Sequence, residues 1–166
     1  MRRILLMVAA LVAVTSAPVA FGEETFEVDR VLVLKKERVL QLLSGDTVIK
    51  SFPIALGPHP GGAKHRLGDG RTPEGIYVID GRSTDTPYRM KLHISYPSAD
   101  DLAYANARHM KPGGEIFIHG MPARFGLTDP ARFFRDWTDG CIAVGNIAIE
   151  EIWNEVVDGT AIDIRP

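Results

Sequence analysis

The chain has little cysteine, no excess of charge of one sign and few long hydrophobic runs. A single cysteine among 166 residues excludes an internal disulfide. The 19 lysines and arginines against 21 acids give a formal charge of -2, which argues against the broadly basic surface that nucleic-acid binding needs. With 45% hydrophobic and 24% charged residues, the composition is that of one ordinary globular domain. We therefore expect neither a nucleic-acid partner nor an integral membrane protein.

The longest apolar run lies at the N-terminus. Arg2 and Arg3 precede an apolar stretch over residues 4–20, and small residues follow it. This order is typical of a secretory signal peptide. The stretch is short for a bilayer span, although an uncleaved anchor is the alternative. We predict a signal peptide over residues 1–22, one domain over residues 23–166 without a membrane span, and export to the periplasm or cell envelope.

Hydrophobic periodicity predicts a mostly β chain with small helices. Apolar runs over residues 25–56, separated by short polar breaks, predict three antiparallel strands in a meander. Residues 57–75 are rich in glycine and proline, so we expect a long functional loop there. Strands are predicted again at 76–79 and 89–95, and strict alternation in the second indicates that one of its faces contacts water.

The second half of the chain is predicted to alternate short strands and helices. In order, the pattern predicts a helix over 98–109, a strand over 115–118, a short helix near 130–135, an amphipathic helix beginning at Asn146 and an edge strand over 160–164. Ser98 is the expected N-cap of the first helix, with Asp101 completing a capping box. Asn146 is the expected cap of the later one.

Two short motifs carry the residue types of nucleophilic catalysis. His119 and Gly120 follow a predicted strand, and Cys141 follows Gly140 later in the chain. A thiol is mostly protonated near neutral pH until a base such as imidazole takes its proton. Glycine allows the backbone to approach a substrate and to stabilise an oxyanion. The motifs predict a thiol nucleophile with a histidine base, and a buried, inert Cys141 is the alternative.

These motifs resemble the signature of the YkuD-type L,D-transpeptidase family. Ile118-His119-Gly120 followed by Thr138-Asp139-Gly140-Cys141-Ile142 is similar to the family's HG followed by S/T-x-G-C-I/V. Residues 68–75, GDGRTPEG, resemble its G-D-x-x-T-P-x-G segment, and the resemblance extends over about residues 26–164. Papain-like and NlpC/P60-type peptidases differ because their cysteine precedes the histidine. Most YkuD-type members carry arginine where this chain has Ala143, which we interpret as a subgroup trait.

The resemblance implies a β-sandwich or barrel-like L,D-transpeptidase domain that needs no cofactor. Cys141 would form a thioester with the third residue of a peptidoglycan stem tetrapeptide and release D-alanine. His119 would serve as base, with the Gly120 carbonyl fixing its tautomer. Amides around Gly140 and Cys141 would bind the oxyanion, and Thr138 would support the turn. The acyl group would pass to a stem amine in a 3→3 crosslink, or to an envelope lipoprotein, in cell-wall biogenesis and the maintenance of cell shape.

Substrate binding is expected to involve two further groups of side chains. The candidates are His93, Ser95, Tyr96, Arg124, Arg132 and Arg135. Arginines between the two motifs could hold substrate carboxylates, with a solvated loop as the alternative. A surface position is the alternative for His93. His59 and His65 lack a neighbouring cysteine or carboxylate pattern, so we predict no metal site.

Two other functions stay open. Because Ala143 replaces the usual arginine, the chain could be a hydrolase, either an L,D-carboxypeptidase or an amidase that cleaves stem-peptide or lipoprotein linkages. A catalytically silent wall-binding scaffold is the other alternative. An activated Cys141 is expected to react with iodoacetamide faster than a free thiol, whereas ordinary reactivity would favour the scaffold.

Overall fold

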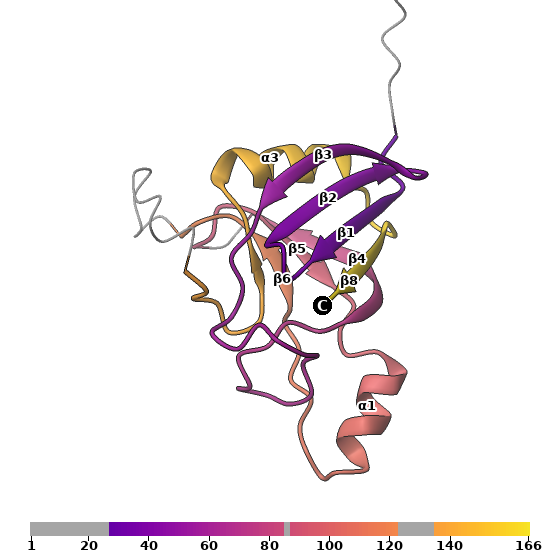
Figure 1. The fold of residues 1–166 in the computed structure, drawn as a ribbon, viewed down its shortest axis with the longest axis vertical. Helices are drawn as coiled ribbons and strands as arrows, with labels where there is room; N and C mark the ends of the chain where they lie inside the picture. Colours follow the sequence, from indigo (N-terminus) through magenta and orange to yellow (C-terminus); the bar gives the residue numbers. More distant parts are fainter. Residues whose placement is uncertain (1–26, 85–86, 123–134) are drawn as a thin grey trace, which may run out of the picture.

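The main element of the protein is a curled sheet of eight strands (Figure 1). The structure, a computed structural model, describes residues 27–84, 87–122 and 135–166. From one edge to the other, the strand order is β3-β2-β1-β8-β4-β5-β6-β7. The sheet curls into a half-barrel, so the prediction of a mostly β, barrel-like domain with small helices is confirmed.

The first three strands form the predicted meander. They are β1 (Arg30–Leu34), β2 (Val39–Ser44) and β3 (Thr47–Pro53), and each pairs antiparallel with the next. Buried and partly exposed positions alternate along β1, since successive side chains in a strand point to opposite faces. The alternation read from the sequence is therefore the alternation of the folded strand.

The remaining strands depart from the prediction at two points. They are β4 (Gly75–Ser83), β5 (Lys91–Ile94), β6 (Phe117–His119), β7 (Ile142–Ala143) and β8 (Ala161–Arg165). The prediction of β8 as an edge strand is wrong, because it pairs parallel with β1 on one side and antiparallel with β4 on the other. β7 was not predicted, because two residues are too few for a periodic pattern.

Helix α1 (Ala99–Asn106) begins as predicted. The Ser98 hydroxyl accepts a hydrogen bond from the Asp101 amide at 3.2 Å, and the Asp101 carboxylate accepts one from the Ser98 amide at 2.9 Å. Only Ala105 of this helix is buried, and α1 projects from the sheet at the end opposite the other helix (Figure 1). The predicted helix near 130–135 falls on residues outside the described ranges, except for its last residue.

Helix α3 (Asn146–Glu155) packs its apolar face against the sheet. Ile149 and Ile152 are fully buried there, and Lys50 of β3 forms ion pairs with Glu151 and Glu155 at 2.7 and 2.6 Å. The prediction that Asn146 caps this helix is wrong. Gly145 is the N-cap without a side-chain bond, because the Asn146 side chain accepts a hydrogen bond from Met121 instead. No helix within the described ranges is long and apolar enough to cross a membrane.

Candidate active site

Cys141 lies at the end of a tight turn that leads into β7. The Thr138 hydroxyl donates to the Cys141 carbonyl at 2.7 Å and accepts from the Gly140 amide at 3.2 Å. Thr72 donates to the Gly140 carbonyl at 2.9 Å. Thr138 and Thr72 are both buried, so two desolvated hydroxyls fix the turn, one from within it and one from a distant loop.

Position 140 accepts only glycine in this arrangement. Gly140 has a φ of +126°, a conformation that side chains rarely adopt. A Cβ at this position would lie 2.5 Å from the Arg71 carbonyl oxygen, which is backbone and cannot move aside cheaply. The glycine before the thiol is therefore required by the close approach of the loop over residues 57–75.

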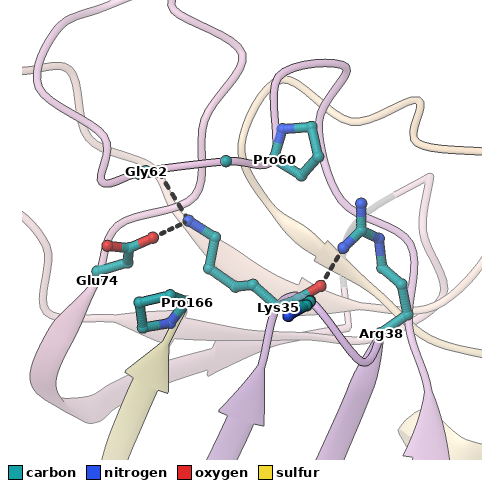
Figure 2. Close-up of a pocket in the computed structure, with 8 residues that line it drawn as sticks. Lys35, Arg38, Pro60, Gly62, Glu74 and Pro166 are labelled. Atoms are coloured by element: carbon teal, nitrogen blue, oxygen red, sulfur yellow. Dashed lines mark hydrogen bonds and ion pairs between the residues drawn. The ribbon is translucent and has the colours of Figure 1, made fainter.

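That loop is anchored by a buried lysine at the end of β1. The Lys35 ammonium, 1% exposed, donates to Glu74 at 2.7 Å, to the Gly62 carbonyl at 2.8 Å and to the Thr72 carbonyl at 3.1 Å. Figure 2 shows Lys35 reaching Glu74 and Gly62 at the base of a pocket. Lys35 thereby holds Thr72 in the place from which it reaches the turn at Gly140.

His119 is the last residue of β6 and is 4% exposed. Its Nδ1 lies 2.8 Å from the Gly120 carbonyl oxygen. Because a carbonyl only accepts, this contact assigns the proton to Nδ1 and leaves the lone pair on Nε2. The rings of Tyr88 and Trp137 cover the imidazole, with centroids 4.3 and 5.7 Å away.

The thiol and the imidazole share one face of the sheet. β6 and β7 pair in parallel, with Ile118 opposite Ile142 and His119 opposite Ala143. Both isoleucines are fully buried in the core, so alternation places the side chains of His119 and Cys141 on the other face. Ala143 is the residue opposite His119, and Cys141 lies two positions before it. The register thus places the two residues that the motifs singled out on the same face of the sheet.

Burial dominates the ionisation of both groups. It raises the pKa of the Cys141 thiol, partly offset by the Phe117 backbone amide, while the charge of exposed Asp139 raises it further. Burial also lowers the pKa of His119, which the Gly120 carbonyl partly offsets. Both pKa shifts favour the neutral forms, a thiol for Cys141 and an uncharged imidazole for His119.

Two lysines that sequence reasoning missed lie near this pair. Lys91 is opposite His119 in the β5–β6 register, and its ammonium lies 4.0 Å from the centroid of the Phe117 ring. Lys91 lowers the pKa of both His119 and Cys141, and Lys64 lowers that of Cys141. The alternation along residues 89–95 was the signal for Lys91, since it placed this side chain on the polar face. Lys64 lies in an irregular loop and had no such signal.

The predicted substrate residues on and after β5 lie in different places. His93 shares the face of His119, pairs opposite Phe117 and has its Nδ1 2.5 Å from a carboxylate oxygen of Asp80. Ser95 extends the sheet instead. Its amide donates to the Val78 carbonyl, and its hydroxyl accepts from the Val78 amide. Tyr96 is 3% exposed in the core and donates to the Pro112 carbonyl. The structure does not bring Ser95 or Tyr96 to the thiol.

The predicted arginines are largely outside the described residues. Arg124 and Arg132 lie in the range 123–134, which the structure does not describe. Arg135 is exposed, and the neighbouring Asp136 accepts hydrogen bonds from Arg38 and from the Leu56 amide at 2.9 Å. Within the described ranges no group of three histidine, cysteine or acidic side chains could hold a metal ion.

Ala143 occupies a closed position two residues after the thiol. It is fully buried, and its amide and carbonyl exchange hydrogen bonds with Ala55 at 2.9 Å. β7 therefore lies between β6 and the segment at Ala55, and Ala143 itself supplies no charge to the site. Within the described part of the chain, the cations near the thiol are Lys64 and Lys91.

Comparison with known protein families gives one match. The YkuD family model, described as the L,D-transpeptidase catalytic domain, matches residues 28–164. This range contains His119, Cys141 and every described strand except the last residue of β8. No curated protein sequence is significantly similar to the chain.

Solved structures share the fold. A point variant of the helical cell shape determining protein Pgp2 from Campylobacter jejuni is 25% identical, with a TM-score of 0.64, and the match covers 83% of this chain and 47% of that one. Bd1075 from Bdellovibrio bacteriovorus is 26% identical, with a TM-score of 0.61, over 86% of this chain and 50% of that one. An L,D-transpeptidase from Xylanimonas cellulosilytica is 16% identical, with a TM-score of 0.54, over 86% of this chain and 62% of that one. The chain spans about half the length of the first two.

Proposed function

The chain belongs to the YkuD family of L,D-transpeptidase catalytic domains, and from this premise we propose that it is an exported cysteine L,D-transpeptidase acting on peptidoglycan stem tetrapeptides. The observation that carries the proposal is the placement of His119, at the end of β6, and Cys141, directly before β7, on one face of the sheet. The bond from His119 Nδ1 to the Gly120 carbonyl supports a role as base, because it leaves Nε2 able to accept a proton.

In the acylation step, the Cys141 sulfur forms a bond to the carbonyl carbon of the third stem residue. His119 Nε2 takes the thiol proton as attack proceeds and returns it to the amine of the departing D-alanine. A concerted transfer suits a pair that is neutral at rest. The oxyanion falls to the Cys141 amide, because the Gly140 amide already donates to Thr138.

In the second step, an amine attacks the thioester and gives its proton to His119, which restores the thiol. The amine belongs to a neighbouring stem peptide, in a 3→3 crosslink, or to a lysine of an envelope lipoprotein. Export, with removal of a signal peptide over residues 1–22, would place the enzyme in the periplasm or cell envelope with these substrates. Pgp2 determines helical cell shape, and a role in cell shape is proposed for this chain by its likeness to Pgp2.

Hydrolysis is the second candidate, favoured by Ala143. With alanine buried at this position, the site has no cation two residues after the thiol to hold an acceptor. Water would then resolve the thioester, which gives an L,D-carboxypeptidase, or an amidase if the acyl group carried a lipoprotein. The two activities share the first step and differ only in the acceptor.

The decisive experiment is mass spectrometry of tetrapeptide muropeptides after incubation with the purified protein. We expect dimers that have lost one D-alanine, with Cys141→Ala as the inactive control of unchanged fold. Tripeptide monomers in place of dimers, or release of peptide from a lipoprotein-linked muropeptide, would assign the hydrolase. Unchanged muropeptides in every reaction would overturn both and leave a wall-binding scaffold.

A further inference from the structure

A cavity of about 470 Å³ lies between the loop over residues 57–75 and helix α1. Its lining includes His59, His65, Arg66, Arg71, Tyr104 and Met110. His65 stacks on Tyr104 with centroids 4.2 Å apart, which forms a flat wall and joins the loop to the helix. The mechanism proposed above uses none of these side chains.

The one acid in the lining, Asp69, is already neutralised. Its carboxylate accepts hydrogen bonds from the Lys64 ammonium at 2.9 Å and from the backbone amides of His65, Arg66 and Arg71 at 2.8, 3.0 and 3.2 Å. Lys64 and Asp69 are both largely buried, with side chains 3% and 8% exposed. The charge of Asp69 is therefore balanced by Lys64, and its carboxylate forms no ion pair with the arginine side chains of the lining.

Arg66 and Arg71 have no side-chain hydrogen bond or ion pair within the described part of the chain. A guanidinium presents a planar fork of donors that matches a carboxylate. The lining thus has two arginines beside an acid that Lys64 already balances. The cavity therefore has the size, the aromatic wall and the charge of a site for a carboxylate-bearing ligand.

The cavity shares its wall with the turn that carries the thiol. The Arg71 carbonyl packs against Gly140, and the next residue, Thr72, donates to the Gly140 carbonyl. Lys64, which holds Asp69, also acts electrostatically on Cys141. A ligand held by Arg71 would thus be connected to the turn before the candidate nucleophile through the contact of Arg71 with Gly140.

We propose that this cavity binds a carboxylate of the peptidoglycan stem peptide outside the reacting centre, through Arg66 and Arg71. The identity of the ligand rests on the function proposed above, whereas the anion site rests on the cavity itself. A stem tetrapeptide carries several free carboxylates, and binding one of them here would anchor the peptide while its third residue reaches Cys141.

The test is a calorimetric titration of the full-length Cys141→Ala protein with stem tetrapeptide, so that no turnover occurs. We expect Arg66→Gln and Arg71→Gln, each made in that background, to weaken the affinity about tenfold or more, the effect of losing a charged hydrogen bond. Arg30→Gln is the matched control, because Arg30 begins β1 at the end opposite Lys35 and the loop. Tetrapeptides amidated at one carboxylate at a time identify the group that is bound.

Affinity that is unchanged in both variants, or absent in the parent protein, would overturn the proposal. If Arg71→Gln lowers the melting temperature, the affinity of Arg66→Gln decides the test, because Arg66 is exposed and its substitution is not expected to affect folding. Turnover by the wild-type protein separates this site from the proposed function. Arginine-dependent binding without turnover would support the anion site and contradict the transpeptidase activity. Turnover with an unchanged KM in both arginine variants would support the activity and contradict the anion site.

Discussion

At the scale of single residues, the ionisation of Cys141 decides how its reactivity is to be interpreted. Burial raises the pKa of the thiol and lowers that of His119, so the resting pair is neutral. The sequence-based expectation that an activated cysteine alkylates faster than free cysteine presumes a resting thiolate. For a neutral pair, slow alkylation is compatible with an enzyme whose proton transfer takes place only during attack on the substrate.

We predict that iodoacetamide alkylates Cys141 more slowly at pH 7 than it alkylates free cysteine, and that the rate rises only above the ordinary pKa of 9.0. Lys91→Met should move this profile to still higher pH, because the lysine stabilises the thiolate. Lys36→Met is the control, since Lys36 is exposed and lines the pocket beside Lys35 and Glu74. A wild-type profile centred below pH 7 would contradict the neutral pair.

The sequence predicted the residues of the site that belong to contiguous motifs. His119, Gly120, Thr138 and Cys141 could be proposed from the sequence because each motif is local. Lys91 reaches His119 only through pairing between β5 and β6, and the arrangement of neighbouring strands is not written in any short pattern. Tyr96 was assigned to the substrate from its place in the resemblance alone, and burial places it in the core.

At the scale of elements, the loop over residues 57–75 depends on one buried cation. Lys35 binds Glu74 and the Gly62 carbonyl (Figure 2) and also the Thr72 carbonyl. The Thr72 hydroxyl in turn binds the turn before Cys141. Burial lowers the pKa of Lys35, which Glu74 partly offsets. Loss of this ammonium would leave a mostly buried carboxylate and two carbonyls without their partner.

Lys35→Met is therefore expected to destabilise the protein by about 2–3 kcal/mol, because removing one member of a buried pair leaves the other uncompensated. Chemical denaturation measures the change. Lys50→Met is the matched control: Lys50 also pairs with two glutamates but is 35% exposed, so its loss should cost less than about 1 kcal/mol. Adding Glu74→Gln to Lys35→Met should restore part of the stability, and strictly additive effects would argue against the pairing.

Elements with a strong local signal were predicted well. The meander and the capped start of α1 follow from alternation and from the pairing of Ser98 with Asp101. Asn146 was misassigned, because its side chain binds Met121 from a segment distant in sequence. A cap preference is local, and a tertiary hydrogen bond overrode it here.

At the scale of the whole molecule, acid stability depends partly on Asp69. Four hydrogen bonds hold its pKa at about 2, below the ordinary 3.8. A carboxylate whose pKa is lowered on folding contributes stability above its unfolded pKa and loses it as pH falls toward the folded value. The contribution is about 2 kcal/mol and disappears between about pH 4 and pH 2.

We predict that the free energy of unfolding of Asp69→Asn falls by about 2 kcal/mol less than that of the wild type between pH 5 and pH 2. Denaturant titrations over this range measure the slope. Asp46→Asn should keep the wild-type slope, since Asp46 is fully exposed and its nearest cation is 3.8 Å away. Parallel slopes for Asp69→Asn and wild type would contradict the depressed pKa.

The position of β8 sets the order in which the protein can be completed. β8 lies between β1 and β4, so these two strands are not joined through the sheet until residues 161–165 are in place. Closing it requires the earliest and latest strands to meet, and contacts so distant in sequence slow folding. During synthesis the sheet therefore stays incomplete until residues 161–165 have been made, so the finished fold forms late in the synthesis of the described domain.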